Sequence, residues 1–115
     1  MKKQILIVED DTSIREMLLE AFEAKGYDVL VADNGMSALN SLTLITPDII
    51  LMDVQMPVMD GLRFRQEQAK HPEWSKIPLL AMSAQSEFKN TFDHFIAKPI
   101  ELDALFNEVS NLSSR

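Results

Sequence analysis

The sequence predicts a doubly wound α/β domain built around a five-stranded parallel sheet. Five short apolar runs alternate with segments whose apolar residues recur at helical spacing. The runs are apolar throughout instead of alternating with polar residues, as expected for strands that helices cover on both faces. At 115 residues, the chain has the length of one compact domain, so we expect a single domain over 1–115.

The first strand and helix show this pattern clearly. The apolar run at 4–9 precedes a helix expected over Ser13–Lys25, and Gly26 is a stop signal after it. Ser13 and Glu16 have the spacing of a capping box at the start of the helix. The apolar face of this helix is expected to contain Ile14, Met17, Leu18, Ala21 and Phe22.

The remaining elements follow in the same order. The other apolar runs lie at 28–32, 48–52, 77–82 and 94–97. Helices are expected from Asn34 until Thr46-Pro47, after Gly61, and from about Glu101. Their apolar faces are expected to contain Ala38, Leu39, Leu42 and Ile45, then Leu62, Phe64 and Ala69, then Leu102, Leu105, Val109 and Leu112.

The connection between the fourth and fifth strands is unusually short. A parallel crossover ordinarily takes about a dozen residues or more, but fewer than that separate Ala84 from His94. The fourth helix is therefore expected to be short or missing. Glu87, Phe88 and Phe92 could supply one amphipathic turn.

Composition excludes several classes of function. The net charge is -7, from 18 acidic and 11 basic residues, and the bases are scattered, so direct nucleic-acid binding is disfavoured. The chain contains no cysteine, which excludes thiolate nucleophiles and cysteine metal sites. The first apolar run is too short for a signal peptide or a membrane-spanning helix, so we expect a cytoplasmic protein without membrane insertion.

Polar side chains follow four of the five predicted strands, where ligands of such sheets bind. Glu9 and Asp10 follow the first strand, Asp53 the third, Ser83 the fourth and Lys98 the fifth. Two carboxylates repel each other by about 4 kcal/mol at 4 Å with an effective dielectric constant near 20, so a cluster of three indicates a divalent cation. Ligands that are all oxygen favour Mg²⁺. A serine hydroxyl and a lysine could stabilise a phosphoryl group on a carboxylate.

Four segments, "ILIVEDD", "MDVQMPVMDG", "MSA" and "FIAKP", resemble the signature motifs of the receiver domains of two-component response regulators. The resemblance covers nearly the whole chain. It implies a flavodoxin-like fold with strand order 2-1-3-4-5. It also implies that Asp53 takes a phosphoryl group from a sensor histidine kinase or a histidine phosphotransfer protein, and that the resulting conformational change is read by a downstream effector protein.

The resemblance also implies a cation site. Asp10 and Asp53 would bind Mg²⁺ directly, the backbone carbonyl of Gln55 would be a third ligand, and Glu9 would act mainly through water. The side chains of Gln55 and Gln85 stand where the family tunes dephosphorylation.

The remaining positions concern the response to phosphorylation. By the same resemblance, Ser83 would hydrogen-bond the phosphoryl group and Lys98 would pair with it. Phe95 would be an aromatic switch whose ring packs inward as Ser83 moves, and the Lys98–Pro99 peptide would be cis. The protein would not be an enzyme beyond its own phosphorylation and dephosphorylation.

Other interpretations remain open from the sequence. Glu9, Asp10 and Asp11 could simply be acids that cap the first helix. A pseudo-receiver that binds a partner without phosphorylation would keep the fold. The short crossover favours it slightly, but the intact set of Glu9, Asp10, Asp53, Ser83 and Lys98 argues against it more strongly. A Mg²⁺-dependent phosphatase with Asp53 as nucleophile is less well supported, because such enzymes need a second acid where this chain has Gln55.

Overall fold

The computed structural model describes residues 2–114, which form a five-stranded parallel sheet with strand order β2-β1-β3-β4-β5. The strands are β1 (Gln4–Val8), β2 (Asp28–Ala32), β3 (Ile49–Asp53), β4 (Leu79–Ser83) and β5 (Phe95–Ala97). Both the predicted fold class and the strand order are confirmed. The sheet is parallel throughout, so the carboxyl ends of all strands lie along one edge.

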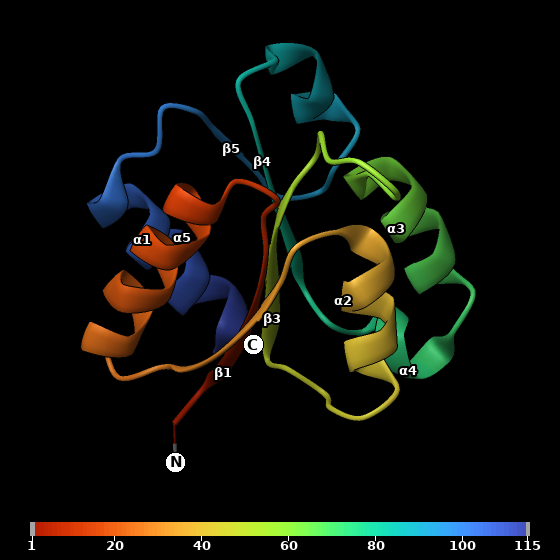
Figure 1. Ribbon diagram of the computed structural model, residues 1–115, viewed down its shortest axis with the longest axis horizontal. Coiled ribbons are helices and arrows are strands. Elements are labelled where there is room, and N and C mark those ends of the chain that lie inside the picture. The colour runs from red at the N-terminus through yellow and green to blue at the C-terminus, as the bar shows by residue number, and fades with distance from the viewer. Residues whose placement is uncertain (1, 115) are drawn as a thin grey trace.

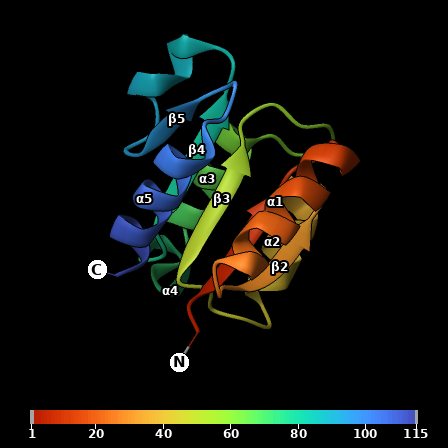
Figure 2. The same cartoon turned by 90° about the vertical axis from the view of Figure 1, so that its left-hand side faces the viewer.

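Helices cover both faces of this sheet (Figures 1 and 2). They are α1 (Thr12–Ala24), α2 (Gly35–Leu42), α3 (Gly61–Ala69), α4 (Pro72–Ser75) and α5 (Leu102–Ser113). Figure 1 shows α1 and α5 on one face and α2, α3 and α4 on the other. This arrangement explains why the strands are apolar on both sides. No helix within residues 2–114 is long and apolar enough to cross a membrane.

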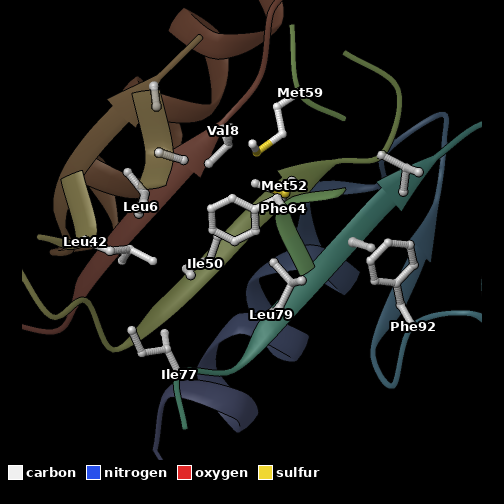
Figure 3. Close-up of a cluster of buried hydrophobic side chains, with 14 residues drawn as sticks. Leu6, Val8, Leu42, Ile50, Met52, Met59, Phe64, Ile77, Leu79 and Phe92 are labelled. Atoms are coloured by element: carbon white, nitrogen blue, oxygen red, sulfur yellow. The ribbon is translucent and has the colours of Figure 1, made fainter. Parts of the chain in front are cut away.

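Each face of the sheet has its own hydrophobic cluster. On the face of α2 and α3, the ring of Phe64 lies fully buried beside Ile50 and Met52 (Figure 3). On the opposite face, Phe22 of α1 and Val109 of α5 are fully buried against the strands. The two clusters pack against opposite faces of the strands and so position the side chains at their carboxyl ends.

The connection between β4 and β5 contains no α-helix, as its length predicts. It forms one 3₁₀ helix, η1 (Ser86–Asn90), near the top of Figure 1. Phe92 follows η1 and packs into the cluster with 4% of its surface exposed. The guanidinium carbon of Arg65 lies 5.7 Å from the centre of that ring, and Arg65 also pairs with Asp93 at 3.6 Å. The side chain of Phe92, with Arg65 of α3 packed against its ring, therefore covers the sheet where a full crossover helix is absent.

Several details of the helices differ from the sequence expectations. Helix α1 begins at Thr12 after Asp11, whose carboxylate accepts from the backbone N–H of Ile14 at 2.9 Å, so the predicted capping box at Ser13 is wrong. Met17 is 40% exposed, because it lies at the flank of the helical face centred on Leu18. Leu102, the first residue of α5, is also exposed.

The apolar face of α3 also differs. Ala69, expected in the core, is exposed, whereas Gln68 is 5% exposed. The amide nitrogen of Gln68 donates to the carbonyls of Trp74 and Ile77 at 2.9 and 3.0 Å, which compensates for the burial of a polar group. The sequence pattern did not reveal these two acceptors, because they lie in the α4 segment and just before β4.

The loop between β3 and α3 has a strained backbone at Val58. Val58 has φ of 68°, and the N–H of Met59 donates to the carbonyl of Pro57 at 2.7 Å, which closes a three-residue turn around it. A β-branched residue is rarely found in this left-handed region. The residue is 79% exposed, so packing does not compensate for the strain.

We expect Val58→Gly to raise the free energy of unfolding by about 1 kcal/mol, because glycine adopts a positive φ without strain and this gain exceeds its entropic cost. Urea unfolding measures the difference. The same exchange at Val31, which is 41% exposed within strand β2, should instead lower stability. A loss of stability in both variants would contradict a strained Val58.

Candidate functional site

Three carboxylates meet at the carboxyl edge of the sheet. Asp53 is the last residue of β3, and Glu9 and Asp10 follow β1 directly. One oxygen from each side chain lies within 4.8 Å of the others. Glu9 is 1% exposed and Asp53 is 7% exposed, whereas Asp10 faces solvent. The structure therefore brings together the three acids that the sequence places at neighbouring strand ends.

Lys98 is the cation that faces this cluster. Its backbone N–H donates to the carbonyl of Ser83 at 2.9 Å, which fixes it just beyond the end of β5. Its ammonium nitrogen lies 3.3 Å from Glu9 Oε1 and 3.3 Å from Asp53 Oδ2. The peptide bond between Lys98 and Pro99 is cis, as the family resemblance implies. One ammonium group thus bridges the two buried carboxylates.

The other predicted positions lie around this centre without contacting the acids through side-chain hydrogen bonds. Ser83 ends β4 and is 1% exposed, and its hydroxyl accepts from the backbone N–H of Gln85 at 3.0 Å. Gln55 is exposed in the loop two residues after Asp53. Phe95 begins β5 and is half-buried against the cluster on the α2 and α3 face. Their predicted roles stay predictions.

The buried acids are electrostatically frustrated. Burial raises the pKa of Glu9 to about 7, and the negative charge of Asp53 adds to this effect. The backbone N–H of Asp11, which donates to Glu9 Oε2 at 3.2 Å, and the charge of Lys98 act in the opposite direction and are weaker. For Lys98, burial by itself would lower the pKa, but the charges of Asp53 and Glu9 outweigh it and leave the pKa raised.

We expect the stability of the metal-free protein to fall as pH rises from about 4.5 to about 7, the values of the Glu9 pKa in the unfolded and folded chain. Below this range Glu9 is protonated in both the folded and the unfolded chain. Within the range it is protonated only in the folded chain, and above the range the folded chain must bury its negative charge. The expected loss is about 1–3 kcal/mol. Urea unfolding across this range tests it.

Two variants separate the contribution of Glu9 from that of other titrating groups. Glu9→Gln cannot ionise and should flatten the pH dependence, whereas Glu16→Gln, at an exposed position of α1, should leave it unchanged. A pH dependence in Glu9→Gln as steep as in the wild type would contradict the assignment.

The donor set fits a hard divalent cation. All three side chains offer carboxylate oxygens, and the exposed Asp10 keeps one side of the cluster accessible to solvent. The helix-capping interpretation applies only to Asp11, whose carboxylate accepts from the backbone N–H of Ile14, so Glu9 and Asp10 are left for the cluster. A cation would offset the repulsion by Asp53, which adds to the effect of burial in raising the pKa of Glu9.

Sequence reasoning missed Arg15. Its guanidinium donates to the backbone carbonyls of Glu9 and Asp10 at 2.9 and 3.4 Å. Side chains on a helix point toward its N-terminus. An arginine near the start of a helix can therefore reach back to the loop that joins the helix to the strand before it. The spacing of Arg15 from Glu9 and Asp10 was the available signal in the sequence. It was not sufficient to distinguish this arginine from an ordinary surface charge.

The fold and the site together define a receiver domain. Residues 5–110 match the family model of the response regulator receiver domain, so the chain belongs to this family. The fourth crossover without an α-helix is a feature of this member.

Comparisons with individual proteins agree. The chain is 32% identical over 115 residues to sporulation initiation phosphotransferase F of Bacillus subtilis, covering 95% of this chain and 92% of that protein. It is 35% identical to the regulatory protein AtoC of Escherichia coli, but spans only 23% of its length. Response regulator protein TrrA of Thermotoga maritima, solved in complex with Mg²⁺-BeF, is 29% identical with a TM-score of 0.86, covering 96% of this chain and 98% of that one.

Proposed function

We propose that Asp53 accepts a phosphoryl group from a phosphohistidine of a sensor histidine kinase or a histidine phosphotransfer protein. The observation that supports this most strongly is the buried carboxylate of Asp53, held within 4.8 Å of two other acids and 3.3 Å from a lysine. Burying acids that repel one another lowers stability, and clusters of this kind are typical of functional sites.

Glu9, Asp10, Asp53 and the backbone carbonyl of Gln55 would hold Mg²⁺. When bound, the cation would neutralise the acids and orient the phosphoryl oxygens. Glu9, the least exposed of the three acids and 3.3 Å from Lys98, would act mainly through water, whereas the exposed Asp10 would reach the cation directly.

In the transfer, a carboxylate oxygen of Asp53 attacks phosphorus as the phosphorus–nitrogen bond to the donor histidine breaks. Lys98 then exchanges its contact with the Asp53 oxygen for a phosphoryl oxygen. Ser83 donates its hydroxyl to another phosphoryl oxygen, and Phe95 packs inward as Ser83 moves. Gln55 and Gln85 at the rim control the access of water that removes the phosphoryl group. No other substrate is turned over.

The change at Phe95 alters the surface near β5, which a downstream effector protein reads. Histidine kinases phosphorylate receivers in the cytoplasm, so the same proposal places this chain there. The acidic surface, with a net charge of -7, supports a protein effector over direct contact with nucleic acid.

Intact-mass spectrometry after incubation with acetyl phosphate tests this function. We expect a single phosphoryl addition that requires Mg²⁺ and is lost in Asp53→Asn. Asp60→Asn is the matched control, because Asp60 is an exposed cap of α3 and should leave phosphorylation unchanged. If the wild type binds Mg²⁺ but is never phosphorylated, the protein is a phosphorylation-independent binding module. Addition that persists in Asp53→Asn would place the phosphoacceptor elsewhere.

A further inference from the structure

Arg15 of α1 has an unusual environment for a partly exposed arginine. It lies beside three acids of the β1–α1 turn, yet among residues 2–114 its guanidinium forms no ion pair. Its Nη1 atom instead donates to the carbonyl of Glu9 at 2.9 Å and to that of Asp10 at 3.4 Å. Its Nη2 atom lies 3.5 Å from Thr12 Oγ1.

These hydrogen bonds act on the backbone of two acids that converge on Asp53. Glu9 is held additionally by its N–H, which donates to the carbonyl of Ala32 at 3.0 Å. The exposed Asp10 has no such support from a neighbouring strand, while the charges of Glu9 and Asp53 repel its carboxylate. Without a restraint on its backbone, Asp10 would turn toward solvent in the absence of a cation.

We propose that Arg15 is a positioning residue for the cation site: it holds the carbonyls of Glu9 and Asp10 so that both carboxylates stay directed at Asp53. Arginine suits this task because the two N–H groups of Nη1 have fixed directions in the guanidinium plane, so this one nitrogen can donate to both carbonyl oxygens. Because Arg15 contacts the carbonyls, its guanidinium does not compete with a cation for the carboxylate oxygens. This inference rests on the proposed function and extends it to a residue outside the cluster.

Mg²⁺ binding measured by isothermal titration calorimetry tests the proposal on the whole chain. We expect Arg15→Met to weaken Mg²⁺ binding about tenfold, the lower end of what loss of a supporting hydrogen bond costs a metal site. Arg15→Lys keeps the charge but loses the planar pair of N–H groups on Nη1, so we expect it to bind Mg²⁺ measurably more weakly than the wild type. Arg63→Met is the matched control, since the Arg63 side chain is 64% exposed and its one ion-pair partner in the described part of the chain is Glu67.

A second measurement separates positioning from a general loss of structure. At saturating Mg²⁺, acetyl phosphate should phosphorylate Arg15→Met at close to the wild-type rate, because Asp53 and Lys98 are untouched. The defect should therefore appear in the Mg²⁺ concentration needed and not in the maximal rate.

Each outcome is decisive. Wild-type Mg²⁺ affinity in Arg15→Met overturns the proposal, and so does wild-type affinity in Arg15→Lys, which would show that the planar guanidinium is not needed. A maximal rate that falls while affinity stays unchanged also overturns it. If the wild-type protein itself neither binds Mg²⁺ nor accepts a phosphoryl group, the proposed function fails, and the inference about Arg15 fails with it.

Discussion

Replacing Lys98 with methionine is expected to lower the free energy of unfolding of the metal-free protein by about 2–4 kcal/mol at pH 8. The methionine keeps most of the length of the side chain but removes the one ammonium group that, within residues 2–114, contacts the cluster, 3.3 Å from both Glu9 and Asp53. The side chains of Glu9 and Asp53, taken without their backbone atoms, are 1% and 10% exposed. Water therefore cannot replace the lost positive charge.

The size of this loss should depend on both pH and Mg²⁺. The charge of Lys98 lowers the pKa of Glu9, so this pKa rises from about 7 when the lysine is removed. At pH values below the raised pKa, Glu9 takes up a proton and the loss of stability becomes smaller. A bound cation supplies the missing positive charge, so Mg²⁺ should stabilise Lys98→Met more than it stabilises the wild type.

Urea unfolding at pH 5.5 and pH 8, with and without Mg²⁺, measures how the loss of stability depends on pH and on the cation. The two pH values lie below and above the Glu9 pKa of about 7. Lys76→Met, at an exposed lysine after α4, should change stability by less than about 0.5 kcal/mol. Adding Glu9→Gln to Lys98→Met should recover part of the loss. If Lys98→Met is as stable as the wild type at pH 8 without Mg²⁺, the burial of Glu9 and Asp53 beside Asp10 does not depend on the lysine.

The fold and the position of the acids could be predicted because they depend on simple periodicities. Continuous apolar runs identify strands that are buried on both sides, and parallel strands bring their carboxyl ends to one edge. That reasoning was sufficient to place Glu9, Asp10 and Asp53 together, and the structure confirms their proximity. The short fourth crossover was also predictable, because chain length alone limits what it can form.

The sequence could not reveal features that depend on contacts distant along the chain or on backbone geometry. The burial of Gln68 depends on two carbonyl acceptors that only the tertiary structure supplies. The left-handed backbone of Val58 follows from the path of its loop, since valine itself disfavours that geometry. Gly35 likewise gave no sign that another loop packs against it.

Gly35→Ala is expected to lower the free energy of unfolding by about 1–3 kcal/mol, although alanine ordinarily stabilises a helix relative to glycine. A Cβ atom at Gly35 would lie 2.6 Å from the carbonyl oxygen of Met59 and 2.8 Å from its Cγ. The N–H of Gly35 also donates to that carbonyl at 3.1 Å, so the two segments cannot separate without losing the hydrogen bond. Met59 must therefore move.

This movement should reach the functional site, because Met59 lies in the loop that joins Asp53 to α3 and contains Gln55. We expect acetyl phosphate to phosphorylate Gly35→Ala more slowly than the wild type, and urea unfolding to show the loss of stability. Asn40→Ala, an exposed exchange to alanine in the same helix, should not destabilise the protein.

Because the nearest atom is a backbone oxygen, shortening the Met59 side chain should rescue Gly35→Ala only partly. Full rescue by Met59→Ala would mean that the flexible side chain, and not the loop backbone, sets the limit, and Gly35→Ala with wild-type stability would mean that the loop moves freely.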